Sequence, residues 1–200
     1  SGGTYRFAVG SAGSATLVLQ AVLPALLFAQ DPSFLTLEGG THNRAAPPFD
    51  FIERSFVPAI RRLGADVDVS LERPGFYPAG GGCIRAEIEP VAKLRPLELT
   101  QRGELVAKRA RALIARLPEA VAARELAAVS AALGWSKEEL ETEPLAGSLC
   151  PGNVLYCEIE SEHVTELFTG FGERSVRSET VAKRAADQAG RYLHGSVPVG

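Results

Sequence analysis

The stretch GGTHNRAAPPFDFI, residues 39–52, marks a change from strand-like to helix-like sequence. Two glycines open a turn, and Pro47 and Pro48 keep the backbone extended before a helix that is predicted to begin at about Phe49. A loop of this kind can hold a flat ligand against a fixed wall, but many such loops are only rigid connections. The residue types alone leave both interpretations open.

The sequence before this loop predicts a strand, a helix and a second strand. Residues 5–9 alternate as a strand does, a helix is predicted over residues 15–30, and a strand over residues 34–38. Ser14 is the predicted N-cap of the helix. Because the helix is almost entirely apolar, we expect it to be buried on most sides.

Two features of this region are candidates for ligand contact. Thr16, Gln20 and Pro24 are spaced by four and share one helix face, where a glutamine is either bonded internally or points into a pocket. The turn before the helix presents backbone N–H groups that favour an anion. Its candidates for phosphate contact are Ser11, Gly13 and Ser14.

After the loop the sequence predicts a helix over residues 49–63 and then an antiparallel hairpin. The hairpin strands, residues 65–73 and 84–88, alternate apolar and polar positions and are joined by the long turn PGFYPAGGG. Asp50 lies in the first helical turn, where a carboxylate interacts favourably with the helix dipole. Residues 4–91 therefore predict one compact α/β unit of the order β-α-β-α-β-β.

The composition changes after Pro90, and a second, smaller α/β module is predicted over residues 97–194. Local propensity predicts a helix over residues 105–117, because alanine and arginine are strong helix formers. The further predicted elements are a helix over residues 119–133, strands over residues 153–160 and 164–170, and a helix over residues 179–193 capped by Ser178.

The composition excludes several classes of protein. A net charge of −3 argues against a generally sticky nucleic-acid binder, although a local basic groove remains compatible with it. The three cysteines lack metal-type spacing and are expected to be ordinary thiols in a reducing compartment. No stretch resembles a membrane span or a signal peptide, so we expect a cytoplasmic protein, or a nuclear one in a eukaryote. Because the chain has no methionine and opens in a strand, we expect an internal fragment of a longer protein.

Three motifs resemble, in order and spacing, consecutive motifs of the RNA 3′-terminal phosphate cyclase family. They are GSAGSATLVLQAVLPAL (residues 10–26), GGTHNRAAPPFDFI (residues 39–52) and RPGFYPAGGG (residues 73–82). The shorter runs AEIEP, PGN and GERSV, which begin at Ala86, Pro151 and Gly172, are similar to the family as well. The resemblance covers essentially the whole chain.

The resemblance implies an ATP-dependent, ligase-type enzyme that converts an RNA 3′-terminal phosphate to a 2′,3′-cyclic phosphodiester. A histidine is adenylylated, AMP passes to the RNA phosphate, and the neighbouring 2′-hydroxyl expels AMP. The implied partners are RNA 3′ ends that carry a phosphate, ATP, and a divalent cation such as Mg²⁺ or Mn²⁺. The resemblance assigns no residue to the metal.

The resemblance also implies a nucleotide site and a domain arrangement. Gln20, Pro47 with Pro48 beside it, and Phe51 correspond to the family's adenosine pocket, where a proline face and an aromatic edge suit a purine. The family's large domain repeats the β-α-β-α-β-β unit, as does the C-terminal domain of translation initiation factor three, and carries a smaller inserted α/β domain. Residues 1–96 are therefore assigned to the large domain, residues 97–194 to the inserted domain and residues 195–200 to the return. The family pattern predicts a strand at residues 105–113, which we adopt over the helix.

No catalytic residue is assigned in this chain. His42, His163 and His194 do not match the motif of the family's nucleophilic histidine, so we expect the 200-residue chain alone not to adenylylate itself. The alternative is a non-catalytic cyclase-like protein that binds RNA during ribosomal RNA processing. Gln20, Pro47 and Phe51 favour the enzyme, because a non-catalytic relative needs no nucleotide pocket. A third interpretation, a carboxyvinyl-transferring enzyme of the same repeated architecture, is disfavoured by the PGFYPAGGG run.

Overall fold

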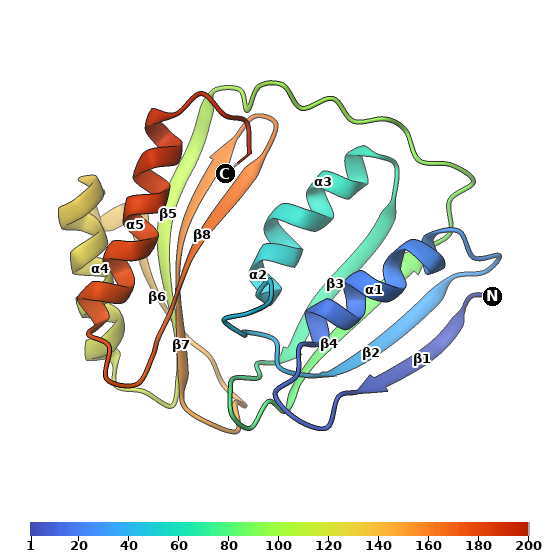
Figure 1. The fold of residues 1–200 in the computed structure, drawn as a ribbon, viewed down its shortest axis with the longest axis horizontal. Coiled ribbons are helices and arrows are strands. Elements are labelled where there is room, and N and C mark those ends of the chain that lie inside the picture. Colours follow the sequence, from blue (N-terminus) through green and yellow to red (C-terminus); the bar gives the residue numbers. More distant parts are fainter. Residues whose placement is uncertain (200) are drawn as a thin grey trace. The chain divides into compact units, whose positions relative to one another are not determined.

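The computed structural model describes residues 1–199, and this part of the chain forms two compact units (Figure 1). Unit 1 comprises Ser1–Glu98 with Ala146–Cys150, and unit 2 comprises Leu99–Leu145 with the chain from Pro151 onward. Each unit contains a four-stranded mixed sheet with helices, which confirms the predicted α/β fold class. The assignment of residues 1–96, 97–194 and 195–200 to family domains stays a prediction.

Unit 1 has the predicted order β-α-β-α-β-β. Its sheet has the strand order β1-β2-β4-β3, in which β1 and β2 are parallel and the other neighbours are antiparallel. The elements are β1 (Gly3–Ala8), α1 (Ala15–Leu27), β2 (Ser33–Gly39), α2 (Phe49–Phe51), a π-helical turn (Ile52–Phe56), α3 (Val57–Arg62), β3 (Asp66–Arg73) and β4 (Gly82–Glu89).

The register of this sheet separates a buried face from an open one. Leu35 pairs with Ala86 and Leu37 with Ile84, and these side chains belong to the core of unit 1. Helices α1 and α3 cover this face of the sheet (Figure 1). Phe34, which pairs with Glu87, is 46% exposed on the other face. The alternation of apolar and polar residues in the sequence therefore reflects a sheet with one covered face and one open face.

The expectation that α1 is buried on most sides is wrong. Leu17 and Phe28 are 46% and 56% exposed, whereas Leu19, Leu23 and Leu27 are buried against the sheet. A helix that lies on a single sheet buries only the stripe that faces it, whatever the residues on its outer side. The predicted cap is confirmed, because Ser14 accepts a hydrogen bond from the Leu17 N–H.

The helix predicted over residues 49–63 is present, but a wider turn interrupts it. Residues Ile52–Phe56 are π-helical, and the backbone N–H of Val57 donates to the Ile52 carbonyl. Pro58 follows directly and has no N–H to donate to the preceding turn, so an ordinary α-helical ladder cannot pass through this point. Gly64, with φ of +95°, follows the helix end, where glycine adopts the left-handed conformation without strain.

Unit 2 packs two helices, α4 and α5, on one face of its sheet. The strand order is β6-β5-β7-β8, with β6 parallel to β5 and the other neighbours antiparallel. The elements are β5 (Leu105–Ala115), α4 (Glu119–Leu133), a 3-10 turn (Lys137–Glu139), β6 (Leu140–Pro144), β7 (Gly152–Ser161), β8 (Thr165–Phe171) and α5 (Ser178–His194). None of the helices in residues 1–199 combines the length and the apolar character that a membrane-spanning helix requires.

Strand β5 overturns the helix predicted there from local propensity and agrees with the strand implied by the family pattern. Ala110, Ala112 and Ile114 face α4 and α5, while Arg109 and Arg111 alternate with them. The small residues let the helices approach this central strand closely. Pairing with a strand on each side outweighs the small difference in intrinsic propensity.

The prediction that Ser178 caps α5 is wrong. The helix begins at Ser178 itself, its N-cap is Arg177, and no side-chain hydrogen bond caps it. The Ser178 hydroxyl is buried and lies 3.3 Å from Nη2 of Arg124, a hydrogen-bond donor on α4. The hydroxyl is therefore used to join two helices.

Candidate functional site

The first two glycine motifs of unit 1 meet backbone to backbone. The Gly40 N–H donates to the Gly13 carbonyl at 2.8 Å, and the Ala15 N–H donates to the Gly40 carbonyl at 2.9 Å. A Cβ at residue 40 would lie 2.5 Å from the Ala12 carbonyl oxygen. No side chain fits there, so glycine is required by the close approach of the two segments.

The third glycine motif closes on the same place. The N–H groups of Thr41 and His42 donate to the Gly75 carbonyl at 2.9 and 3.2 Å, and the Gly75 N–H donates to Thr41 Oγ1 at 2.9 Å. Gly80 has φ of +65°, and a Cβ there would collide with the Ser11 carbonyl. The three motifs therefore form one frame in which backbone contacts leave little freedom.

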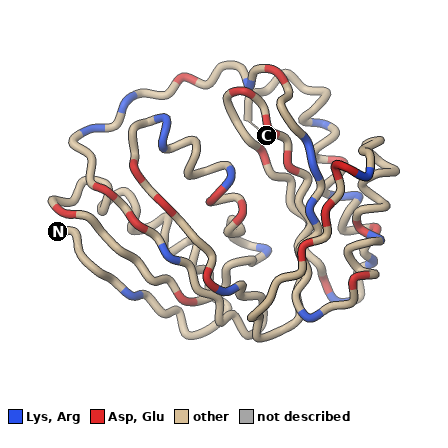
Figure 2. Tube along the Cα trace, turned by 180° about the vertical axis from the view of Figure 1, so that it is seen from behind, with Lys and Arg blue, Asp and Glu red and all other residues tan. Residues whose placement is uncertain are grey.

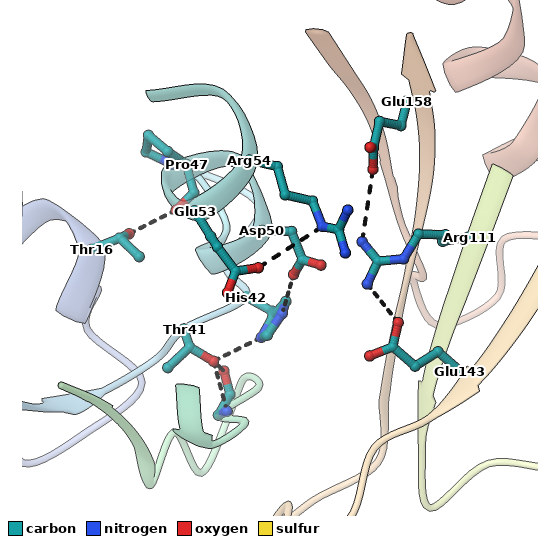
Figure 3. A network of polar contacts seen from close by, with 11 residues as sticks. Thr16, Thr41, His42, Pro47, Asp50, Glu53, Arg54, Arg111, Glu143 and Glu158 are labelled. Atoms are coloured by element: carbon teal, nitrogen blue, oxygen red, sulfur yellow. Dashed lines mark hydrogen bonds and ion pairs between the residues drawn. The ribbon is translucent and has the colours of Figure 1, made fainter. Parts of the chain in front are cut away.

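A buried chain of side chains continues this frame through His42 (Figure 3). Nδ1 of His42 lies 2.7 Å from Thr41 Oγ1, and Nε2 lies 3.1 Å from Asp50 Oδ2. The imidazole is 2% exposed and stacks on Phe76 with ring centroids 5.0 Å apart. Thr41 Oγ1 accepts from the Gly75 N–H, and its hydroxyl proton is then directed at Nδ1, which accepts it. The imidazole therefore carries its own proton on Nε2 and donates it to the Asp50 carboxylate.

This arrangement suits positioning better than nucleophilic attack. Both ring nitrogens of His42 have partners, so either would have to break a hydrogen bond before it attacked a phosphate. Asp50 lies in the first turn of α2, as the dipole argument expects, but its carboxylate also accepts from the imidazole. The pair joins the start of the loop at residues 41–48 to the helix that ends the loop.

Gln20 lies on the same face of α1 as Thr16, which contacts the proline segment of this loop. Thr16, one helical turn before Gln20, donates its hydroxyl to the Pro47 carbonyl at 2.7 Å (Figure 3). Residues four apart share a helix face, so the Gln20 amide belongs to the side of α1 that is bonded to Pro47. Gln20, Pro47 and Phe51 are each half-buried, whereas Pro48 is buried.

The predicted phosphate contacts lie in the turn before α1. The Gly13 N–H lies 3.2 Å from Ser11 Oγ, and Ser14 Oγ accepts from the Leu17 N–H and lies 2.7 Å from Thr16 Oγ1. A phosphate would have to replace some of these bonds. Phosphate binding here stays a prediction.

The buried thiols of Cys83 and Cys157 do not offer a nucleophile. Burial, reinforced by a hydrogen bond to Glu72, raises the pKa of the Cys83 thiol to about 11. Burial alone raises the pKa of the Cys157 thiol to about 12. Both groups remain protonated at neutral pH. Across the described part of the chain, no group of three or more His, Cys, Asp or Glu side chains is placed to hold a metal ion, and the divalent cation stays a prediction.

A depression of about 390 Å³ lies on the open face of the unit 1 sheet, around Phe34. Residues of both signs are interspersed along the strands (Figure 2), and Arg85 pairs with Glu72 at 2.8 Å and Arg6 with Glu38 at 2.9 Å. Within each pair, the negative charge of the glutamate largely offsets the positive charge of the arginine. The positive charge of Arg85 and Arg6 on this face is therefore largely compensated, which makes the face a poor surface for a phosphate-bearing ligand.

Unit 2 contains a buried acid that the sequence analysis missed. Glu125 is 1% exposed, its Oε1 accepts from Asn153 Nδ2 at 2.6 Å, and its Oε2 is buried without a hydrogen-bond partner among the described residues. Burial raises the pKa of this carboxyl to about 7, although Asn153 acts in the opposite direction. The signal was present, because Ala122, Leu126 and Val129 mark a buried stripe that includes position 125.

Comparison with known proteins identifies a close set of relatives. A family model described as RNA 3′-terminal phosphate cyclase matches residues 1–193. The RNA 3′-terminal phosphate cyclase of Koribacter versatilis is 51% identical over 194 residues, which cover 97% of this chain and 55% of that protein. Those of Pseudomonas fluorescens and Ralstonia nicotianae are 51% and 50% identical over 99% of this chain and over 58% and 57% of their own lengths. The chain therefore spans little more than half the length of these relatives.

Proposed function

The chain belongs to the RNA 3′-terminal phosphate cyclase family, and we propose from this that the full-length protein cyclises RNA 3′-terminal phosphates in an ATP-dependent reaction. Unit 1 contributes part of the nucleotide site in this proposal. The RNA substrate and the use of ATP are inferred from the family. The chemistry of Gln20, Pro47 and Phe51 supports a nucleotide as ligand.

The observation that carries the proposal is the hydrogen bond from Thr16 to the Pro47 carbonyl. It joins the polar face of α1 to the proline segment, so that an amide, a proline ring and an aromatic ring are presented by adjoining elements. Pro47 and Phe51 offer apolar surface to a purine, and the Gln20 amide both donates and accepts hydrogen bonds. The frame of backbone contacts lowers the entropy that would be lost when a ligand orders the loop.

The chemistry explains why a nucleotide is needed. A phosphate oxygen is a poor leaving group, whereas AMP joined to the terminal phosphate departs readily. When AMP has been transferred to the RNA 3′-phosphate, the 2′-hydroxyl attacks that phosphorus, the bond to AMP breaks, and the cyclic phosphodiester remains. A divalent cation, Mg²⁺ or Mn²⁺, would offset phosphate charge when bound. We assign the adenylylated histidine to none of His42, His163 and His194.

Labelling of the full-length protein with α-³²P-ATP tests the proposal. The wild-type protein is expected to become labelled and to cyclise a 3′-phosphorylated oligoribonucleotide. Loss of one or two hydrogen bonds in Gln20→Ala should raise the KM for ATP roughly 3- to 10-fold. The matched control is Gln30→Ala, an exposed glutamine beyond the end of α1, which should leave the KM unchanged.

Two results would contradict this assignment. A wild-type protein that binds RNA but never forms a cyclic end would favour the non-catalytic alternative. Unchanged kinetics in Gln20→Ala would remove this residue from the site. The 200-residue chain alone is expected to acquire no label, and labelling of it would show that a nucleophile lies within these residues.

A further inference from the structure

Tyr77 stands at the tip of a loop whose two sides are firmly held. Its side chain is 79% exposed, whereas the neighbouring Phe76 is 4% exposed. The Gly80 N–H donates to the Phe76 carbonyl at 2.7 Å and closes the loop beneath the tip. An aromatic ring left in water contributes little to folding, so its position calls for another explanation.

The loop is fixed before any ligand arrives. The Phe76 ring is stacked on His42, and the Cys150 thiol donates to the Phe76 carbonyl at 3.3 Å. Arg73 donates through Nε to the Gly81 carbonyl, which holds its guanidinium on the same loop. A ring presented in this way loses little conformational entropy when it binds something.

The same loop is part of the frame that holds the candidate nucleotide site. Gly75 is bonded to Thr41 and His42, from which the chain runs on to Pro47, and Gly80 packs against the backbone of the turn at Ser11. The tip therefore belongs to one rigid arrangement with the segments that would receive ATP and the terminal phosphate.

We propose that Tyr77 is a stacking platform for a base of the RNA strand whose phosphorylated 3′ end enters this site. The inference rests on the proposed function. Stacking of bases on aromatic side chains is a general means of holding single-stranded nucleic acid without regard to sequence. Arg73, bonded to the Gly81 carbonyl of the same loop, supplies a cation for a backbone phosphate.

The surroundings of Tyr77 favour a nucleotide base over a protein partner. The apolar side chains exposed around the tip are this ring, the small side chains of Pro78 and Ala79, and Leu149, which is 58% exposed and lies against Gly81. A specific protein interface buries about 800 Å² on each partner, far more than these few side chains offer. A single base, in contrast, covers one aromatic ring.

The test measures binding of a 3′-phosphorylated oligoribonucleotide to the full-length protein. Tyr77→Ala should raise the Kd for this RNA between about 5-fold and 150-fold and leave the KM for ATP unchanged. Tyr77→Trp should retain binding, and the fluorescence of the new tryptophan should be quenched by the RNA. Phe34→Ala, which removes an exposed ring from the open sheet face, is the matched control and should bind as the wild type does.

An abasic series identifies the stacked base. When the nucleotide that contacts Tyr77 lacks its base, wild type and Tyr77→Ala should bind the RNA equally. If the wild type cyclises RNA but Tyr77→Ala binds it unchanged, the platform is excluded and the proposed function stands. Unchanged RNA binding with a lost protein–protein association would assign the ring to a protein contact instead. If the wild type neither binds nor cyclises the RNA, the proposed function itself fails.

Discussion

His42 in unit 1 and Glu125 in unit 2 are both buried and titratable, but their surroundings differ. Both ring nitrogens of His42 are bonded, to Thr41 and Asp50, and its ring stacks on Phe76. Glu125 has one oxygen bonded to Asn153 and the other without a partner among the described residues. The imidazole of His42 therefore has both its hydrogen-bonding atoms paired, whereas the carboxyl of Glu125 has only one of its two oxygens hydrogen-bonded.

The difference shows how each unit uses buried polarity. In unit 1 the histidine connects the loop at residues 41–48 to the glycine motifs and so contributes to a rigid frame at the proposed site. In unit 2 the protonated form of the Glu125 carboxyl is favoured, because ionisation would place a negative charge in a buried site with few compensating groups. The following predictions test this contrast, and the single tryptophan, Trp135 in unit 2, separates the two units spectroscopically.

His42→Ala should have the largest effect. It removes the buried, stacked ring and one hydrogen-bond donor to the Asp50 carboxylate, so unit 1 should lose about 3–5 kcal/mol of stability. Urea unfolding followed by circular dichroism should show this loss, while the Trp135 fluorescence transition of unit 2 should not move. His194→Ala, at an exposed position, is the control. A loss below about 1 kcal/mol would mean that the chain of partners does not stabilise unit 1.

Glu125 should make unit 2 sensitive to pH. The pKa of Glu125 in the folded protein, about 7, lies above the ordinary value of 4.5. Its contribution to the free energy of unfolding is therefore fully present below pH 4.5 and is lost as the pH rises to about 7. The decline should be at most about 3 kcal/mol. Unfolding followed through Trp135 at several pH values measures it. Glu125→Gln, which stays neutral, should remove this part of the slope, and an unchanged slope would contradict the assignment.

Gly40→Ala should destabilise unit 1 by about 1–3 kcal/mol, because the new methyl group would be driven against the Ala12 carbonyl. Gly10→Ala separates this steric effect from backbone strain. Gly10 has a positive φ, of +71°, and a Cβ there would meet nothing within 4 Å. Its substitution should cost only about 1 kcal/mol. Equal losses of stability in the two variants would show that glycine at position 40 is not required by the close approach of the Ala12 carbonyl.

Thr16→Val should give the smallest change, a loss of about 1–2 kcal/mol from unit 1, since it removes the hydrogen bond to the Pro47 carbonyl and the one shared with Ser14 Oγ. Thr180→Val, on the exposed side of α5, is the matched control. Thermal unfolding of the two variants compares them. An equal effect would indicate that the bond between α1 and the proline segment is not maintained in solution.

The sequence predicted most of unit 1 because its elements carry strong local signals. The alternation of Val67 and Val69 with acidic residues and the glycine after α3 identify element types without tertiary information. Strand β5 could not be found this way, since its alanines and arginines prefer a helix until neighbouring strands pair with them. Strand β6 was missed because LETEP is short, mostly polar and ends in proline.

The candidate site was predictable only in part. The resemblance supplied Gln20, Pro47 and Phe51, and whether these residues bind a nucleotide stays a prediction. The bond from Thr16 to a backbone carbonyl and the pairing of Thr41 with Gly75 depend on where distant backbone segments meet. No local pattern in the sequence carries that information.

Photolabelling of the full-length protein with 8-azido-ATP tests most directly whether unit 1 carries the nucleotide site. Trypsin cleaves after Arg6, Arg44 and Arg54, so residues 45–54, with Pro47 and Phe51, and residues 7–44, with Gln20, are released as separate peptides. A nucleotide site on unit 1 predicts that ATP-protectable label appears in the peptide of residues 45–54 or in that of residues 7–44. Protectable label confined to peptides outside residues 7–54 would contradict a nucleotide site on unit 1.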